Sequence, residues 1–131
     1  MTTKTRITKH KTILSTLNEE IGEIFLTNCS NKKGIKIHHI EFKIFDDYEH
    51  YKNKGIMTKA VADYLQYCKE GNINSLIAIV KKDNIASVRV LEKNNFAKLQ
   101  ELEKFYIYVI DLRFEPDFTK KTIQEFQKRI F

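Results

Sequence analysis

The chain has 131 residues, 42% of them hydrophobic, and a formal net charge of +6 at pH 7. This length and composition predict a single domain, residues 1–131, with a hydrophobic core. No apolar run approaches the length of a membrane span, and the polar, basic N-terminus has no signal-peptide pattern. Cys29 and Cys68 are far apart and the histidines are scattered, which excludes a spaced metal-ligand set and favours reduced thiols in a soluble, cytoplasmic protein.

Basic residues gather near both ends of the chain. Residues 1–10 are predicted to form a basic N-terminal arm that carries Lys4, Arg6 and Lys9, and a second basic group lies within 116–131. One interpretation is contact with nucleic acid or another polyanion, and the other is ordinary solvated surface. We favour solvated surface because no aromatic side chains that could stack on bases are interleaved with the arm.

The first half of the chain carries strand patterns. Strands over 12–17 and 20–28 are predicted to form a hairpin, and a third strand is predicted over 35–45. Apolar and polar residues alternate along this third strand, as His39, Ile40, Glu41, Phe42, Lys43 and Ile44. Ile37 falls in the opposite phase, which predicts a bulge near His38.

A basic turn with one glycine, residues 51–58, leads into a helix predicted over 57–70. Apolar residues recur there at helical spacing, as Met57, Ala60, Val61, Tyr64, Leu65 and Cys68. Gly71 stands where the helix is expected to end. The first N–H groups of a helix have no partner within it, and its dipole favours an anion. With Gly55 allowing close approach of the backbone, the turn is predicted to bind phosphate.

The second half begins with the apolar run 76–80, which predicts a strand that is parallel, central and buried on both faces. A helix follows over 84–94, and its first residue is an asparagine suited to capping. Two further strands are predicted over 97–103 and 105–112, and a terminal helix over 119–130.

Two motifs resemble those of a known family. Residues Lys52 to Met57 resemble the Q/R-x-x-G-x-G/A pyrophosphate loop of the GNAT superfamily of acyl-CoA N-acetyltransferases, although Lys52 and Met57 depart from the usual residues. Residues Asn84 to Phe96 resemble the N-x-x-S-x-R-V-x-E-K-x-G-F helix of the ribosomal-protein (Rim-type) branch. Only the glycine differs, and its replacement, Asn95, can also adopt a left-handed cap. One apolar strand separates the motifs, which makes the resemblance specific.

The resemblance implies an α/β fold, with a GNAT-like mixed, mostly antiparallel sheet and two crossover helices. Residues 116–131 would add a C-terminal helical extension. The family usually begins with another strand and a pair of helices that wall the acceptor site, and only about ten residues precede the first hairpin here. The chain is therefore identified as a minimal member. Its acceptor site is either open or completed by the C-terminal helix or by a second subunit in a homodimer.

The resemblance also implies acetyl-CoA as cosubstrate, and no metal. The backbone of the turn would take the pyrophosphate, and the residue that opens the second motif would touch the pantetheine arm. The implied cofactor-binding residues are Lys52, Asn53, Lys54, Gly55, Ile56, Met57, Thr58, Asn84 and Ser87.

In this family the acceptor amine attacks the thioester directly. The protein then needs a base that deprotonates the amine and an acid that protonates the leaving thiolate. Glu41 is the candidate catalytic base by its position on the third strand. His39 shares its face and has a reference pKa near 6.5, while the alternative for both residues is a solvated strand face. Ser87 is the candidate catalytic acid, because Leu91 stands where many members carry a tyrosine. Two tyrosines of the last strand are further donors, Tyr106 and Tyr108.

Together, these features predict a cytoplasmic N-acetyltransferase that transfers an acetyl group from acetyl-CoA to a primary amine. The Rim-type motifs favour a protein or peptide N-terminus as the acceptor. A small-molecule amine, such as a polyamine or an aminoglycoside, is the alternative within the same class. From another class, Leu91 and the short N-terminus suit a catalytically silent module that binds CoA or a protein partner.

Overall fold

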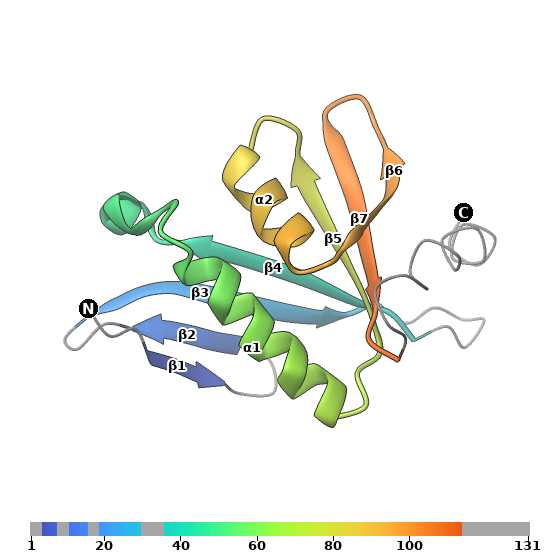
Figure 1. Cartoon of the computed structure of the whole chain (residues 1–131), viewed down its shortest axis with the longest axis horizontal. Coiled ribbons are helices and arrows are strands. Elements are labelled where there is room, and N and C mark those ends of the chain that lie inside the picture. Colours follow the sequence, from blue (N-terminus) through green and yellow to red (C-terminus); the bar gives the residue numbers. More distant parts are fainter. Residues whose placement is uncertain (1–3, 8–10, 16–18, 30–35, 114–131) are drawn as a thin grey trace.

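The computed structural model describes residues 4–7, 11–15, 19–29 and 36–113, which form one seven-stranded sheet and its helices (Figure 1). The strands are β1 (Lys4–Ile7), β2 (Lys11–Ser15), β3 (Glu20–Asn28), β4 (His38–Ile44), β5 (Ser75–Lys81), β6 (Ala97–Glu101) and β7 (Phe105–Asp111). The helices are the 3-10 helix η1 (Asp46–Tyr51), α1 (Ile56–Glu70) and α2 (Ile85–Lys93). The predicted terminal helix over 119–130 lies outside the described residues.

The strand order in the sheet is β1-β2-β3-β4-β5-β7-β6. Neighbouring strands are antiparallel except for β4 and β5, which are parallel and are joined through η1 and α1. A parallel pair needs such a crossover connection, because a tight turn reverses the chain direction. The predicted mixed, mostly antiparallel sheet is therefore confirmed.

Strands β4 and β5 form a fork in the middle of the sheet. They pair only where both begin, at His38 with Leu76 and at His39 with Ile77. Beyond these residues the strands diverge, and the helix α2 lies over the opening (Figure 1). Because the facing edges of the fork do not pair with each other, their backbone groups remain available to a third chain or a ligand.

The main core lies between one face of the sheet and the two α-helices. All six apolar residues of the predicted helical stripe, from Met57 to Cys68, are buried in α1. They pack against side chains from four strands, including Ile24, Leu26, Ile40, Ile44, Leu76, Ala78, Val80, Tyr108 and Ile110. Burial of each large apolar side chain contributes about 1.5–3 kcal/mol, so this stripe fixes α1 on the sheet.

The opposite face of β5 corrects one expectation. Leu76, Ala78 and Val80 are buried under the helices, but Ile79 on the other face is 48% exposed. The prediction that this strand is buried on both faces is therefore wrong, because α1 and α2 cover the same face of the sheet. Its parallel pairing with β4 and its central place are confirmed.

Three local features differ from the sequence-based expectations. Lys4–Ile7, within the predicted basic arm, forms strand β1 and pairs antiparallel with β2. The bulge predicted near His38 is absent from the described register, which runs without a shift from Asn28 opposite His38 to Gly22 opposite Ile44. The phase change arises because β4 begins at His38 and leaves Ile37 before the strand. The 3-10 helix η1 was not predicted.

Candidate functional site

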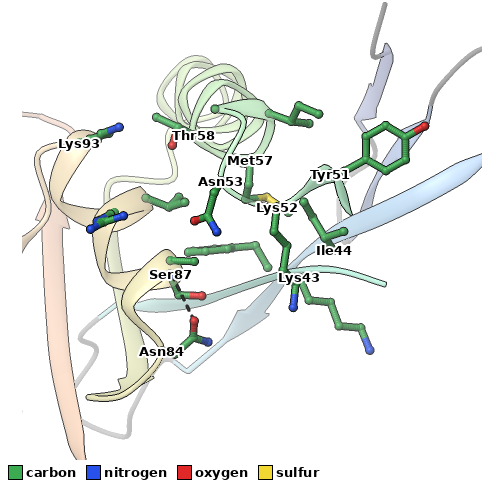
Figure 2. Close-up of a pocket in the computed structure, with 16 residues that line it drawn as sticks. Lys43, Ile44, Tyr51, Lys52, Asn53, Met57, Thr58, Asn84, Ser87 and Lys93 are labelled. Carbon is green, nitrogen blue, oxygen red and sulfur yellow. Dashed lines mark hydrogen bonds between the residues drawn. The ribbon is translucent and has the colours of Figure 1, made fainter. Parts of the chain in front are cut away.

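A pocket of about 210 Å³ opens where the end of β4 meets the N-terminus of α1 and one side of α2 (Figure 2). The end of β4, the turn before α1, and α2 with its cap all contribute side chains to the wall. The lining residues are Phe42, Lys43, Ile44, Tyr51, Lys52, Asn53, Gly55, Ile56, Met57, Thr58, Asn84, Ala86, Ser87, Arg89, Val90 and Lys93. The structure thus brings the two sequence motifs together around one cavity.

The turn before α1 presents a bare helix N-terminus to this pocket. Gly55 is the N-cap residue with φ of +76°, and as a glycine it has no side chain that could cap the helix. The first helical bond runs from the N–H of Lys59 to the carbonyl oxygen of Gly55, so the N–H groups of Ile56–Thr58 have no partner inside the helix. Apart from Gly55 and its two chain neighbours, no described residue has an atom within 4 Å of where a Cβ on Gly55 would stand. The backbone therefore faces open space, as anion binding requires.

The charge of the lining matches an anion. Four of the lining residues are cationic, Lys43, Lys52, Arg89 and Lys93, and among these described lining residues none is acidic. Lys52 lies 3.3 Å from the Glu49 carboxylate. Such exposed pairs are weak, so the cations retain most of their attraction for a ligand.

The start of α2 contributes neutral polar groups at the other end of the pocket. Asn84 Oδ1 accepts a hydrogen bond of 3.2 Å from the backbone N–H of Ser87, which confirms the predicted cap (Figure 2). The cap uses the amide oxygen of Asn84, and both Asn84 and Ser87 line the pocket. The predicted left-handed residue at the other end of this motif is also present, since Asn95 has φ of +66°.

A buried amide joins the two helices that form the pocket. Asn94, only 8% exposed, donates from Nδ2 to the carbonyl oxygen of Thr58 at 3.1 Å and to that of Val90 at 2.9 Å. Thr58 lies in the first turn of α1, and Val90 lies in α2. This side chain therefore holds the C-terminal end of α2 beside the bare N-terminus of α1.

Glu41 lies outside the pocket lining, on the sheet face opposite the helices. Its side chain is 62% exposed, and its Oε1 lies 3.5 Å from Nδ1 of His39. The side chain of His39 is 18% exposed and its Nε2 is buried without a hydrogen-bond partner in the described chain. The two candidate bases are thus neighbours at the base of the fork, and the pocket does not include either.

The other predicted site residues fall in different places. Lys54 is exposed and is not among the residues that line the pocket, whereas the rest of the predicted cofactor-binding set is. Leu91 is 1% exposed and belongs to the core. The Tyr108 hydroxyl donates to Glu92 at 3.2 Å, and the ring of Tyr106 packs under the Lys98 ammonium, so neither tyrosine lines the described pocket.

Sequence reasoning missed several lining residues. In the sequence, Lys43 appears only as a polar position of the third strand, and Tyr51 only as the first residue of the basic turn. Arg89 and Lys93 stood inside the second motif but received no role. Their four-residue spacing, which places two cations on one side of a helix, was the available signal.

Two kinds of feature are absent from the described part of the chain. No helix there has both the length and the hydropathy that crossing a membrane requires. In the same residues, His, Cys, Asp and Glu side chains form no group of three or more that could hold a metal ion.

Solved structures share this fold. Ribosomal-protein-S5-alanine acetyltransferase from Vibrio fischeri has a TM-score of 0.67 and 20% identity, over 78% of this chain and 61% of that one. A GNAT-family acetyltransferase from Bacillus anthracis has a TM-score of 0.66 and 21% identity, over 79% and 67%. Campylobacter jejuni N-acetyltransferase PseH in complex with acetyl coenzyme A has a TM-score of 0.60 and 20% identity, over 79% and 70%.

The chain thus spans about three fifths of the length of the Vibrio protein. No curated protein matches it in sequence. The profile of the acetyltransferase (GNAT) domain family matches residues 5–97, which include the fork, the bare N-terminus of α1 and all of α2. The chain therefore belongs to the GNAT family of acetyltransferase domains.

Proposed function

We propose that the chain is an N-acetyltransferase that binds acetyl-CoA in the pocket and transfers its acetyl group to a primary amine. One observation carries the proposal. The bare N-terminus of α1 at Gly55 opens into a pocket that has four cationic and no acidic residues in its described lining. Such a site favours a phosphorylated ligand over a cationic or neutral one.

The volume of the pocket suits one part of acetyl-CoA. Its volume of about 210 Å³ is below the range of about 300–1,000 Å³ that is usual for drug-sized ligands. It therefore suits a narrow arm, with the bulkier nucleotide part lying at the surface. The backbone N–H groups of Ile56–Thr58 would bind the phosphates, while Asn84 and Ser87 would contact the arm from α2.

Acetyl-CoA supplies an activated thioester, and the chain must manage two protons. As the amine attacks the carbonyl carbon, the C–N bond forms, the C–S bond breaks, and the amine loses a proton. Glu41 is proposed to take that proton through a water, because its exposed carboxylate lies at the base of the fork on the face away from the helices. Ser87 is proposed to give a proton to the leaving thiolate from the pocket side. The neighbour of Glu41, His39, remains the alternative base.

For the acceptor, we propose the N-terminal amine of a protein or peptide. The Vibrio fischeri protein, whose name specifies the alanine of ribosomal protein S5, supports this choice by its likeness in fold. The exposure of Glu41 also supports a large acceptor, since a bulky chain can reach this carboxylate without entering a closed pocket. A homodimer that completes the acceptor site, and a cytoplasmic location, stay predictions.

Calorimetric titration of Gly55→Asp with acetyl-CoA tests the proposed cosubstrate. The substitution places a carboxylate beside the proposed phosphate position, so we expect binding to fall below detection while the fold is retained. The control is Asn72→Asp, which places a carboxylate at another positive φ, 61°, just beyond the opposite end of α1. Equal affinity of wild type and Gly55→Asp would contradict the proposal. Thiol release with a panel of amines and N-terminal peptides then tests turnover.

A further inference from the structure

Helix α2 carries two cationic residues whose presence does not stabilise the helix. Arg89 and Lys93 are four residues apart and both line the pocket. Like charges at this spacing destabilise a helix. In the described part of the chain neither forms an ion pair with a carboxylate, and the neighbouring Glu92 accepts a hydrogen bond from Tyr108 instead. An anionic ligand would balance the pair.

Each of the two cations on the other side of the pocket lies near one carboxylate. Lys43 Nζ lies 3.8 Å from the Glu23 carboxylate, and Lys52 Nζ lies 3.3 Å from that of Glu49. Figure 2 shows Lys43 and Lys52 on the side of β4 and the turn, and Lys93 on the side of α2. In the described part of the chain, the lining cations without a nearby carboxylate therefore lie on α2.

The negative charge of the proposed ligand is also distributed unevenly, because its phosphate groups do not all carry the same charge. The two phosphates of a pyrophosphate diester carry about one negative charge each, which suits the N–H groups at the start of α1. A phosphate monoester carries about −1.5 to −2 at pH 7 and three acceptor oxygens, which suits two adjacent cations. CoA has one such group, the 3′-phosphate of its adenosine.

We propose that Arg89 and Lys93 form a subsite for the 3′-phosphate, so that the pocket distinguishes CoA from 3′-dephospho-CoA. The inference rests on the proposed function, because it needs CoA in the pocket. Asn94 makes the subsite rigid, since its amide holds this end of α2 against the first turn of α1, where the pyrophosphate would bind. The separation between the two phosphate positions is thereby set before the ligand arrives.

The experiment is calorimetric titration of the full chain with CoA and with 3′-dephospho-CoA at one fixed low salt concentration. A charge-assisted phosphate contact predicts that wild type binds CoA roughly tenfold more tightly than 3′-dephospho-CoA. The double variant Arg89→Gln, Lys93→Gln should bind both ligands with the weaker affinity of wild type for 3′-dephospho-CoA. Both side chains are exposed, so the variant should fold, and far-UV circular dichroism checks this. The matched control is Lys69→Gln, a loss of charge in the last turn of α1, which should keep the wild-type preference.

The outcomes separate this inference from the proposed function. If wild type binds neither ligand, the proposed function fails and the subsite with it. If wild type binds both equally well, CoA binding stands and the 3′-phosphate subsite is refuted. If the double substitution weakens the binding of CoA and of 3′-dephospho-CoA by the same factor, the two cations act on the pyrophosphate. The assignment to the 3′-phosphate is then also refuted.

Discussion

Replacing Asn94 by alanine should destabilise the protein although this residue touches no proposed substrate. The side chain donates two hydrogen bonds, to the carbonyl oxygens of Thr58 and Val90, and is 8% exposed. A neutral hydrogen bond contributes about 0.5–1.5 kcal/mol net, so the loss of both should lower the free energy of unfolding by about 1–3 kcal/mol. With a urea slope of about 2 kcal/mol per M, the unfolding midpoint should fall by roughly 1 M.

Asn94→Asp sharpens this test, because the two side chains have nearly the same shape. The new carboxylate would face two carbonyl oxygens in a buried site, so at pH 7 it should destabilise more than alanine does. Burial and the carbonyl oxygens would raise the pKa of the introduced carboxyl above its ordinary value of about 3.9. The extra penalty is therefore present above the folded pKa and disappears as the pH falls below the unfolded value, where the protonated acid can donate.

Urea unfolding at pH 7 and at pH 4, followed by circular dichroism, measures these differences. The control is Gln66→Ala, which removes an exposed amide that donates to Glu70 on the surface of α1, and its midpoint should stay close to wild type. The argument is refuted if Asn94→Ala unfolds at the midpoint of Gln66→Ala with an unchanged slope. It is also refuted if Asn94→Asp is no worse than Asn94→Ala at pH 7.

Four further predictions follow from burial and exposure. Leu91→Tyr should cost about 1–3 kcal/mol in urea unfolding and raise no turnover, because this 1% exposed position lies in the core and not in the pocket lining. At pH 8 a thiol reagent should label Cys29 quickly and Cys68 only on unfolding, because Cys29 is exposed and burial raises the pKa of Cys68 to about 11. Since folded Cys68 keeps a proton that the unfolded chain loses, the free energy of unfolding should fall between about pH 9 and 11 in denaturant titrations. Glu41→Gln should lower kcat by about 10²-fold and leave acetyl-CoA affinity nearly unchanged in calorimetry, whereas an unchanged kcat would exclude it as base.

Much of the candidate site could be predicted because its elements are local. Gly55 and the apolar stripe of α1 lie within a few turns of chain, so the sequence indicates both the helix and its bare N-terminus. The same holds for α2, whose capping residue Asn84 and left-handed Asn95 are each read from short-range patterns. Lys54 is the exception, since it belongs to the turn but is exposed and is not among the residues that line the described pocket.

The sequence by itself determined most of the strands, both α-helices, the glycine turn before α1 and the resemblance to the family, since these depend on short-range patterns along the chain. Only the tertiary structure decided which side chains share the pocket. Lys43 and Arg89 come from β4 and α2, and they line one cavity because β4 and β5 part after two paired residues. The exposure of Ile79 and the link from Asn94 to Thr58 were likewise decided by packing. Periodicity records which residues of one element share a face, but which elements meet across the fork depends on how the whole sheet is paired and covered.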